Sequence, residues 1–405
     1  MEKKLSLAVF NTQPPHLYFG GVERRIVETA KRLVNKVGTR VYCGTKAGFN
    51  KIASVNGAIF VPCFSTDVIF PLDNWFFNRT ISRMSDVIKA DVYEAHTVSG
   101  YGILKALKKR GALKPFIQTV HGVLADEYMQ SSQSAFPTPR TKLSNFFMWR
   151  LSKIEEESAR NANLIVAVSK YSSKKIVKFY NVDETKIRIV PNGVDPQKFR
   201  PAKGCEKLKH RLGIDNNQCV LFVGRLVPRK GLHFLIEAAK HVVKERKKTV
   251  FLVVGEGPLK NHLISNSKKE GLSNNFIFLG DVRDEVLPML YNCADVFALP
   301  SIQEGQGLAL LEAQATAKPS VAFNVGGISE SVLDKKTGLL VKPDSYELAN
   351  AVLNLLSNSS LREKMGRLGR EFVCKNFTWD ICAEKMFRVY CEALQFVKSK
   401  SLPNA

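Results

Sequence analysis

The chain has 405 residues, which is long enough for two domains of ordinary size. Its composition, 45% hydrophobic and 24% charged residues, is typical of a globular protein. No apolar run approaches the roughly 20 residues of a membrane span. The eight cysteines form no Cys-x-x-Cys pair, which argues against zinc or a disulfide framework and predicts a reducing, cytoplasmic location. The net charge is +23, and residues 1–200, with 31 basic and 16 acidic residues, contribute +15. This excess favours anionic partners, either phosphorylated acceptors, lipid surfaces or nucleic acid, unless it reflects a general lysine bias of the proteome.

The apolar segment Leu5–Phe10 predicts a first buried strand, because it is too short for a signal peptide. It leads to the paired glycines Gly20 and Gly21, which would let the backbone approach a ligand closely. A helix follows and ends at Gly38. The glycines do not form Gly-x-Gly-x-x-Gly, so the dinucleotide-binding fingerprint is absent.

Strand-like segments then alternate with helical ones, which predicts a parallel, doubly wound α/β sheet. These segments are Arg40–Cys43, Ala58–Val61, Asp91–Ala95, Phe116–Val120 and Leu164–Val168.

Two histidines follow strands of this sheet. His121 comes directly after Phe116–Val120, and His96 ends Asp91–Ala95 in the same manner. Open α/β sheets bind ligands at the carboxyl ends of their strands. A lone histidine is more often structural, and this is the interpretation favoured for His96. For His121, the structural and ligand-binding interpretations are equally supported.

The segment Arg140–Lys153 interleaves basic residues with Phe146, Phe147 and Trp149. Such a segment can dock on anionic lipid. Because it continues toward the next buried strand, an ordinary helix packed on the sheet is the favoured interpretation.

The turn-rich segment 190–201 predicts a domain boundary. A second set of strands follows it. Arg225 and Lys230 both lie at the carboxyl end of the first of these strands, and two cations there predict a pyrophosphate site that needs no metal. Two solvated basic residues are the alternative. The strands are Cys219–Val223, Val250–Val254, Ile277–Leu279 and Val296–Leu299.

The stretch that follows the last of these strands carries two glutamates eight residues apart. Glu304 is expected on a strand-to-helix loop, and Glu312 on the helix. Between them, the helix start at Gly307 and Leu308 offers free N–H groups and the positive end of a dipole to a phosphate. One carboxylate would bind sugar hydroxyls and the other ribose hydroxyls. Ordinary surface glutamates are the alternative.

Taken in order, these motifs resemble those of the GT-B glycosyltransferases, in particular the large family 4 type, also described as glycosyl transferases group 1. The resemblance implies an N-terminal Rossmann-like acceptor domain (1–197), a C-terminal nucleotide-sugar domain (198–378) and a final helix (379–405) that returns to the first domain. The motifs are Gly20-Gly-Val-Glu, His121-Gly, Val168-Ser, Pro191-Asn-Gly-Val-Asp, Val223-Gly-Arg-Leu with Lys230-Gly, Val254-Gly-Glu-Gly-Pro, and Glu304 and Glu312 with Gly307-Leu308.

The resemblance also implies roles on the nucleotide-sugar domain. Arg225 and Lys230 would bind the donor diphosphate together with the helix start, and Glu312 the ribose hydroxyls. Glu304 would hold hydroxyls of the donor sugar, and Gly255 would line the base pocket.

Two further residues receive roles from the resemblance. His121 would contact the transferred sugar, and Gly21 would let the backbone approach the diphosphate or acceptor. Gln306 departs from the family, which often has Phe there, so the identity of the sugar stays open.

The activity implied is transfer of a hexose or N-acetylhexosamine from a nucleotide-diphosphate sugar to a glycan, lipid-linked or small-molecule acceptor. The resemblance implies retention of the anomeric configuration and no cofactor. The transfer would also need no metal, because no Asp-x-Asp pair occurs to bind one. A catalytically silent nucleotide-sugar-binding subunit and a glycan phosphorylase-like enzyme are the alternatives. No nucleic-acid partner is expected, since no known RNA or DNA module occurs. The expected location is cytoplasmic, or peripheral on the inner face of an anionic membrane.

Overall fold

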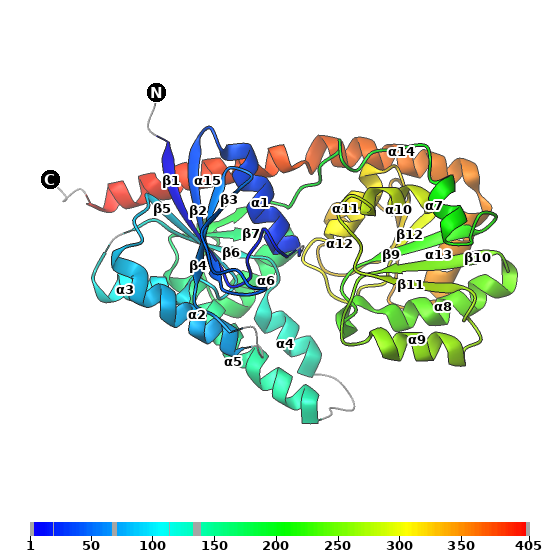
Figure 1. The fold of residues 1–405 in the computed structure, drawn as a ribbon, viewed down its shortest axis with the longest axis horizontal. Coiled ribbons are helices and arrows are strands. Elements are labelled where there is room, and N and C mark those ends of the chain that lie inside the picture. The colour runs from blue at the N-terminus through cyan, green and yellow to red at the C-terminus, as the bar shows by residue number, and fades with distance from the viewer. Residues whose placement is uncertain (1–3, 19, 67–70, 113, 133–138, 402–405) are drawn as a thin grey trace. The chain divides into compact units, whose positions relative to one another are not determined.

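The computed structural model describes residues 4–18, 20–66, 71–112, 114–132 and 139–401. The chain divides into two compact units (Figure 1). Unit 1 comprises residues 1–192 and 379–405, and unit 2 comprises residues 193–378. The sequence placed the first boundary after residue 197 instead.

Unit 1 is built on an eight-stranded sheet in the order β3-β4-β2-β1-β5-β6-β7-β8. All its strands pair in parallel except β3, which is antiparallel to β4. The expected parallel, doubly wound sheet is thus confirmed, with one short antiparallel strand added at its edge. The strands are β1 (Leu5–Asn11), β2 (Val37–Gly44), β3 (Ala53–Val55), β4 (Ala58–Cys63), β5 (Val92–His96), β6 (Phe116–Val120), β7 (Leu164–Ala167) and β8 (Ile187–Ile189).

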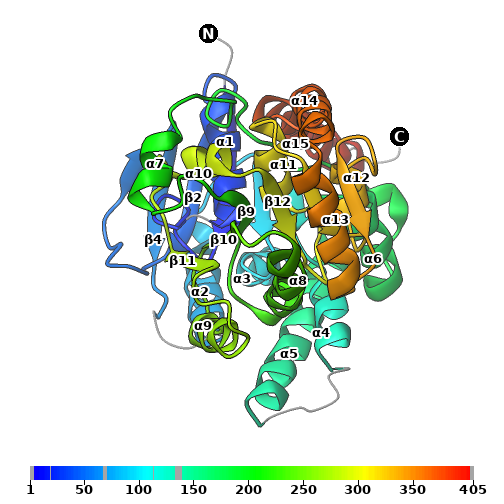
Figure 2. The same ribbon diagram turned by 90° about the vertical axis from the view of Figure 1, so that its right-hand side faces the viewer.

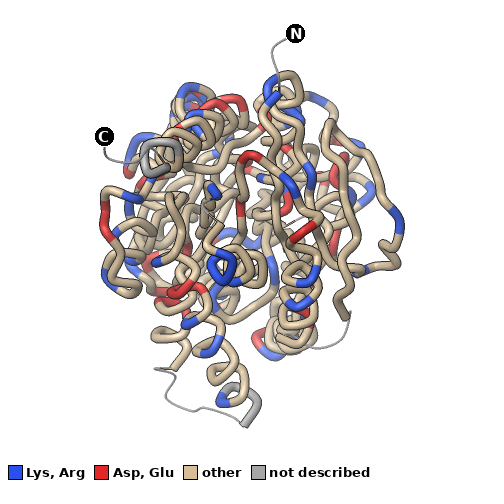
Figure 3. Tube along the Cα trace, turned by 90° about the vertical axis from the view of Figure 1, so that its left-hand side faces the viewer, with Lys and Arg blue, Asp and Glu red and all other residues tan. Residues whose placement is uncertain are grey.

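Helices cover both faces of this sheet. The C-terminal helix α15 packs beside α1, and α2, α3 and α5 form the layer on the other face (Figure 1). On the side of the chain drawn in Figure 3, Lys and Arg residues are scattered, with Asp and Glu residues between them. The helices are α1 (Gly21–Leu33), α2 (Leu72–Arg83), α3 (Tyr101–Lys109), α4 (Leu124–Ser132), α5 (Pro139–Asn161), α6 (Lys170–Tyr180) and α15 (Trp379–Ser401), with short 3-10 turns at Met84–Asp86 and Glu184–Lys186.

Unit 2 has a six-stranded, all-parallel sheet in the order β11-β10-β9-β12-β13-β14. The apolar runs that form it are buried on both faces, as parallel strands between helix layers require. The strands are β9 (Gln218–Val223), β10 (Thr249–Val254), β11 (Phe276–Gly280), β12 (Val296–Leu299), β13 (Ser320–Phe323) and β14 (Gly338–Val341).

Two helix layers enclose this sheet (Figure 2). Helices α8, α9 and α13 form one layer, and α7, α10, α11 and α14 the other. The helices are α7 (Glu206–Arg211), α8 (Leu232–Glu245), α9 (Lys260–Lys269), α10 (Leu287–Cys293), α11 (Leu308–Ala315), α12 (Ile328–Ser331), α13 (Ser345–Ser357) and α14 (Ser359–Asn376), with a 3-10 turn at Pro228–Lys230.

Among the helices within these described ranges, none combines the length and hydrophobicity that crossing a membrane requires.

Candidate active site

The strand order of unit 2 reverses between β9 and β12, because the chain builds outward from these two neighbouring strands in opposite directions. Ligands of open α/β sheets bind at such a switch point, beyond the carboxyl ends of the strands. The residues that follow β9 are Gly224 and Arg225, and Pro300 follows β12. The two stretches in which the sequence predicted cations and carboxylates therefore begin side by side.

An ion pair joins these two stretches. The Lys230 ammonium donates a hydrogen bond to Oε1 of Glu304. The Ser301 hydroxyl donates to the same oxygen at 2.9 Å, and Nη1 of Arg229 lies 3.9 Å from Oε2. Burial alone would raise the pKa of Glu304, but the charges of Lys230 and Arg229 outweigh it and lower that pKa below its ordinary value. Glu304 is therefore an ionised carboxylate at neutral pH, although only 7% of it is exposed.

Backbone contacts hold the Glu304 loop in place. Gly231 has a φ of +66°, and a Cβ on it would lie 1.9 Å from the carbonyl oxygen of Pro300, so only glycine fits. The Ile302 amide donates to the Arg229 carbonyl at 2.9 Å, and the Gly327 amide to the Glu304 carbonyl at 3.0 Å. The loop that carries the carboxylate is thus fixed from two sides.

Helix α11 begins at Leu308, directly after Gly307, whose φ of +85° makes the turn into the helix. Glu312 lies on this helix and is only 4% exposed. Its Oε2 accepts a hydrogen bond of 2.8 Å from the Tyr291 hydroxyl on α10. The alternative that Glu304 and Glu312 are ordinary surface glutamates is therefore wrong, since both are buried and hydrogen-bonded.

Arg225 and Gly255 occupy neighbouring backbone positions. Arg225 is exposed, whereas Lys230 is half-buried, so the alternative of two solvated cations fails for Lys230. A Cβ on Gly255 would lie 2.2 Å from the carbonyl oxygen of Gly224 and 3.7 Å from the Arg225 nitrogen. The protein's own packing accounts for glycine at position 255, and the predicted role of Gly255 in a base pocket stays a prediction.

Unit 1 has its own switch point, between β1 and β5. Helix α1 begins at Gly21, beyond the end of β1. A Cβ on Gly21 would meet nothing within 4 Å, whereas one on Gly20 would lie 2.1 Å from Oε2 of Glu23. The space beside Gly21 is left open by the protein, which is compatible with its predicted approach to a ligand.

His121 follows β6, the strand next to β5. Its Nε2 lies 2.9 Å from Nδ1 of His96, which is 1% exposed at the end of β5. The structural role expected for His96 therefore includes a contact with His121 that the strand pattern does not predict. The available signal was the pair Glu94 and His96, two polar residues two positions apart on a buried strand and hence on one face.

Within the described ranges, no three His, Cys, Asp or Glu side chains gather in a group able to hold a metal ion. Independence of metal stays a prediction about the reaction.

Two sequence families match the chain in succession. Residues 19–198 match the family described as Glycosyltransferase Family 4, and residues 206–372 match Glycosyl transferases group 1. A UDP-Gal:alpha-D-GlcNAc-diphosphoundecaprenol alpha-1,3-galactosyltransferase of Escherichia coli is 30% identical over 313 residues, which are 75% of this chain and 76% of the relative.

Other relatives match over shorter spans. An uncharacterized glycosyltransferase of Methanocaldococcus jannaschii is 29% identical over 58% of this chain, and a D-inositol 3-phosphate glycosyltransferase of Salinispora arenicola is 31% identical over 69%. The chain spans 61% and 64% of the length of these two relatives, respectively.

Solved structures show the same fold. Sucrose-phosphate synthase from Thermosynechococcus elongatus superposes with a TM-score of 0.82 at 19% identity, over 97% of this chain and all of that one. HepE of Anabaena, in complex with UDP-glucose, superposes with a TM-score of 0.75 at 19% identity, over 96% of this chain and all of that one.

Two doubly wound α/β units, each with polar residues at its switch point, define the GT-B fold. Within that fold, the chain belongs to the glycosyltransferases of the family 4 type.

Proposed function

We propose that the protein is a glycosyltransferase that moves a hexose or N-acetylhexosamine from a nucleotide-diphosphate sugar to an acceptor. The observation that carries this proposal is the Lys230–Glu304 ion pair at the β9/β12 switch point, next to the free N–H groups at the start of α11. A cation and a helix N-terminus suit a diphosphate, and an ionised carboxylate suits sugar hydroxyls. A nucleotide sugar contains both groups. The UDP-glucose in the Anabaena neighbour supports this donor class.

In the proposed reaction, negative charge builds up on the departing diphosphate as the glycosidic bond breaks. Lys230, Arg225 and the α11 amide groups at Gly307 and Leu308 would stabilise that charge, as preorganised donors do at developing anions. Glu312, held by Tyr291, would accept hydrogen bonds from the ribose hydroxyls.

We propose retention of the anomeric configuration, with the departing phosphate accepting the acceptor's proton on the same face. Glu304 is not proposed as a glycosidase-like nucleophile, since Lys230 and Ser301 bind its Oε1 and Arg229 lies beside its Oε2, an arrangement that holds the carboxylate as a hydrogen-bond acceptor. Its proposed role is to accept hydrogen bonds from the donor sugar. The proposed reaction requires no metal, because cationic side chains and helix amides would meet the diphosphate charge.

We propose a lipid-linked or membrane-bound glycan as acceptor. The Escherichia coli relative carries a diphosphoundecaprenol acceptor in its name. Helix α5 exposes Leu143, Phe146 and Trp149, with exposed fractions of 57%, 53% and 39%, and the exposed cations Lys142 and Arg150 flank them. Apolar and basic side chains together suit an anionic membrane surface. The side chain of Arg140 lies outside the described residues.

A panel of UDP-, GDP- and ADP-sugars tests the proposal through thermal stabilisation and through release of the nucleoside diphosphate with and without candidate acceptors. We expect one donor to stabilise the protein and to be hydrolysed slowly. Stabilisation without any turnover, with every acceptor tried, would favour the catalytically silent subunit. An absence of both effects for all donors would contradict the proposal.

A further inference from the structure

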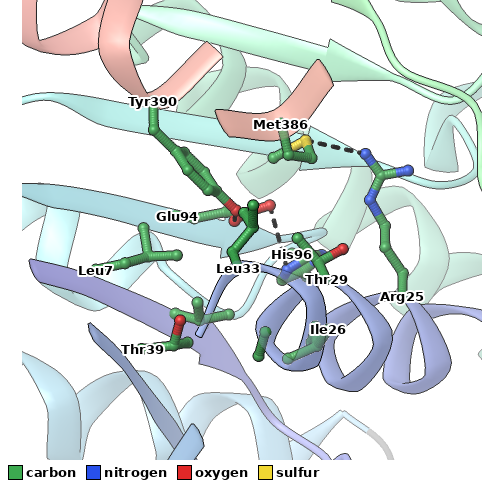
Figure 4. Close-up of a pocket in the computed structure, with 12 residues that line it drawn as sticks. Leu7, Arg25, Ile26, Thr29, Leu33, Thr39, Glu94, His96, Met386 and Tyr390 are labelled. Atoms are coloured by element: carbon green, nitrogen blue, oxygen red, sulfur yellow. Dashed lines mark hydrogen bonds and ion pairs between the residues drawn. The ribbon is translucent and has the colours of Figure 1, made fainter. Parts of the chain in front are cut away.

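A chain of three polar side chains leads inward from His121. Nε2 of His121 lies 2.9 Å from Nδ1 of His96, and the two rings stack with centroids 5.2 Å apart. The other ring nitrogen of His96, Nε2, lies 3.5 Å from Oε1 of Glu94 (Figure 4). Each histidine nitrogen on this path therefore has one defined neighbour.

Glu94 is held by donors on two other elements. The Tyr390 hydroxyl on α15 donates to Oε2 at 2.6 Å, and the Thr119 hydroxyl on β6 donates to Oε1 at 2.7 Å. Burial first, and then the charge of Glu94, raise the pKa of Tyr390 well above its ordinary value, so its hydroxyl keeps the proton. Both carboxyl oxygens of Glu94 therefore accept hydrogen bonds, and Nε2 of His96 faces one of them, Oε1.

The surroundings leave these side chains little freedom. Glu94 is 3% exposed, and with His96, Arg25 and Tyr390 it lines a cavity of about 10 Å³ between β5, α1 and α15 (Figure 4). That volume is close to the smallest that holds one water molecule. Arg25 is itself fixed, because its Nη1 donates to the Val190 carbonyl at 2.9 Å.

Both rings are neutral at physiological pH. Burial lowers the pKa of His96 to about 4, with Glu94 opposing and Arg25 adding to the effect. Burial, together with His96 and Arg25, holds the pKa of His121 well below its ordinary value. A neutral imidazole carries one N–H and one acceptor nitrogen. The position of the proton on His96 therefore determines the position of the proton on His121, because their nitrogens share a hydrogen bond.

The acceptor oxygen Oε1 of Glu94 decides where the proton of His96 lies. It attracts the N–H of His96 to the nearer nitrogen, Nε2, and would repel the lone pair of the other tautomer. Nδ1 of His96 is then an acceptor, and the 2.9 Å contact requires Nε2 of His121 to donate. The remaining nitrogen of His121, Nδ1, is left with a lone pair.

We propose that Glu94 and His96 are positioning residues that lock His121 in the Nε2–H tautomer and present its Nδ1 as an acceptor for a hydroxyl of the donor sugar. The sugar part of this inference rests on the proposed function. The tautomer part concerns the free protein and is independent of the reaction.

The tautomer is measured by ¹⁵N NMR of the full-length protein with ¹⁵N-labelled histidine, in which protonated and unprotonated ring nitrogens have well-separated shifts. The His121→Asn variant assigns the resonances. We expect wild-type His121 at pH 7.5 to be protonated at Nε2 only. We expect Glu94→Gln, which removes the charge but keeps the shape, to populate the Nδ1–H form as well. A wild-type Nδ1–H tautomer, or a ratio unchanged in Glu94→Gln, would overturn the proposal.

Measurements of ligand binding distinguish a positioning role of Glu94 from a general structural role. We expect Glu94→Gln to weaken binding of the nucleotide sugar about tenfold, and to leave binding of the nucleoside diphosphate alone unchanged, since that ligand carries no sugar hydroxyl. Equal weakening of both ligands would mean a merely structural effect and would contradict the sugar part. Thr39→Val, which alters the wall of the same cavity from β2, is the matched control and should change neither ligand nor tautomer. If the wild-type protein binds no nucleotide sugar, the proposed function fails while the NMR result still decides the tautomer.

Discussion

In the free protein, the ammonium of Lys230 is bound to the carboxylate of Glu304. The side chains are only 14% and 8% exposed, respectively. The cation predicted for the diphosphate and the carboxylate predicted for the sugar hydroxyls therefore neutralise one another before any donor binds. A donor diphosphate would share Lys230 with Glu304, and the pair would orient both groups in advance.

The first prediction separates Lys230 from Arg225. Replacing either residue with Ala should reduce transition-state stabilisation by about 2–4 kcal/mol, which is comparable with the loss of one oxyanion donor. The loss is measured as a decrease in kcat/KM. Arg225→Ala should leave the free energy of unfolding unchanged, because the side chain is exposed. Lys230→Ala should lower it by about 3 kcal/mol, because it leaves Glu304 buried without its main partner.

Steady-state kinetics and urea unfolding measure the two effects. The double variant Lys230→Ala/Glu304→Gln is the control: it removes the uncompensated charge, so we expect recovery of stability without recovery of activity. Full turnover in both single variants would contradict the assignment to the diphosphate.

The second prediction concerns metal. Activity should survive treatment with EDTA, since the side chains proposed to meet the diphosphate charge are cations and amides rather than metal ligands. The assay is donor turnover before and after chelation, with a known metal-dependent glycosyltransferase treated in parallel. Activity lost to EDTA and restored by Mg²⁺ or Mn²⁺ would rule out the proposed mechanism.

Sequence patterns predicted the two sheets well where strands are continuous apolar runs. They missed the short edge strands β3, β8 and β14, and also β13, because runs of three or four residues carry little periodicity. The antiparallel pairing of β3 with β4 depends on a turn that the parallel pattern did not anticipate.

For the site residues too, the sequence predicted positions along the chain but not the contacts between side chains. Strand-end positions placed Lys230 and Glu304 on adjacent loops, but their ion pair depends on side-chain packing between segments 74 residues apart. The contact of His96 with His121 likewise requires the pairing of β5 with β6, which strand spacing alone does not specify.

The third prediction follows from Glu155, a fully buried residue of α5. Its Oε2 accepts hydrogen bonds from the Leu124 amide and the Tyr180 hydroxyl. Burial raises the pKa of Glu155 to about 7, against the opposing effect of these hydrogen bonds. The folded protein therefore holds a proton that the unfolded chain releases near pH 4.5.

Because the folded state binds more protons across this window, Glu155 makes stability fall as the pH rises from about 4.5 to about 7. Above pH 7, ionising the buried Glu155 lowers the free energy of unfolding by its full amount, about 3 kcal/mol. We expect Glu155→Gln to be more stable than wild type at pH 8 by up to that amount, and equal to it near pH 4.5. Urea unfolding at several pH values measures the difference, with Glu157→Gln, an exposed neighbour, as control. A gain that does not depend on pH would contradict the raised pKa.

The last prediction concerns the membrane. A second group of basic residues lies on α3 and at its C-terminal end, Lys105, Lys108, Lys109 and Arg110. Two of these cations already have hydrogen-bond or ion-pair partners. Lys108 donates to Asn161, and Arg110 pairs with Asp86. The exposed side of α5 is the stronger candidate, because it adds aromatic side chains to its cations.

Reversible binding to anionic vesicles is expected at low salt, with each basic residue near the surface contributing on the order of 1 kcal/mol. Binding should weaken as salt rises, because screening shortens the reach of surface charge. Phe146→Ser and Trp149→Ser should each reduce binding without loss of stability, since both side chains are exposed. Trp75→Ser is the matched control, because Trp75 on α2 is 53% exposed but lies outside this surface. Co-sedimentation with neutral and anionic vesicles at low and high salt measures these effects. Failure to bind either kind of vesicle at low salt would exclude the membrane contact and favour a soluble acceptor.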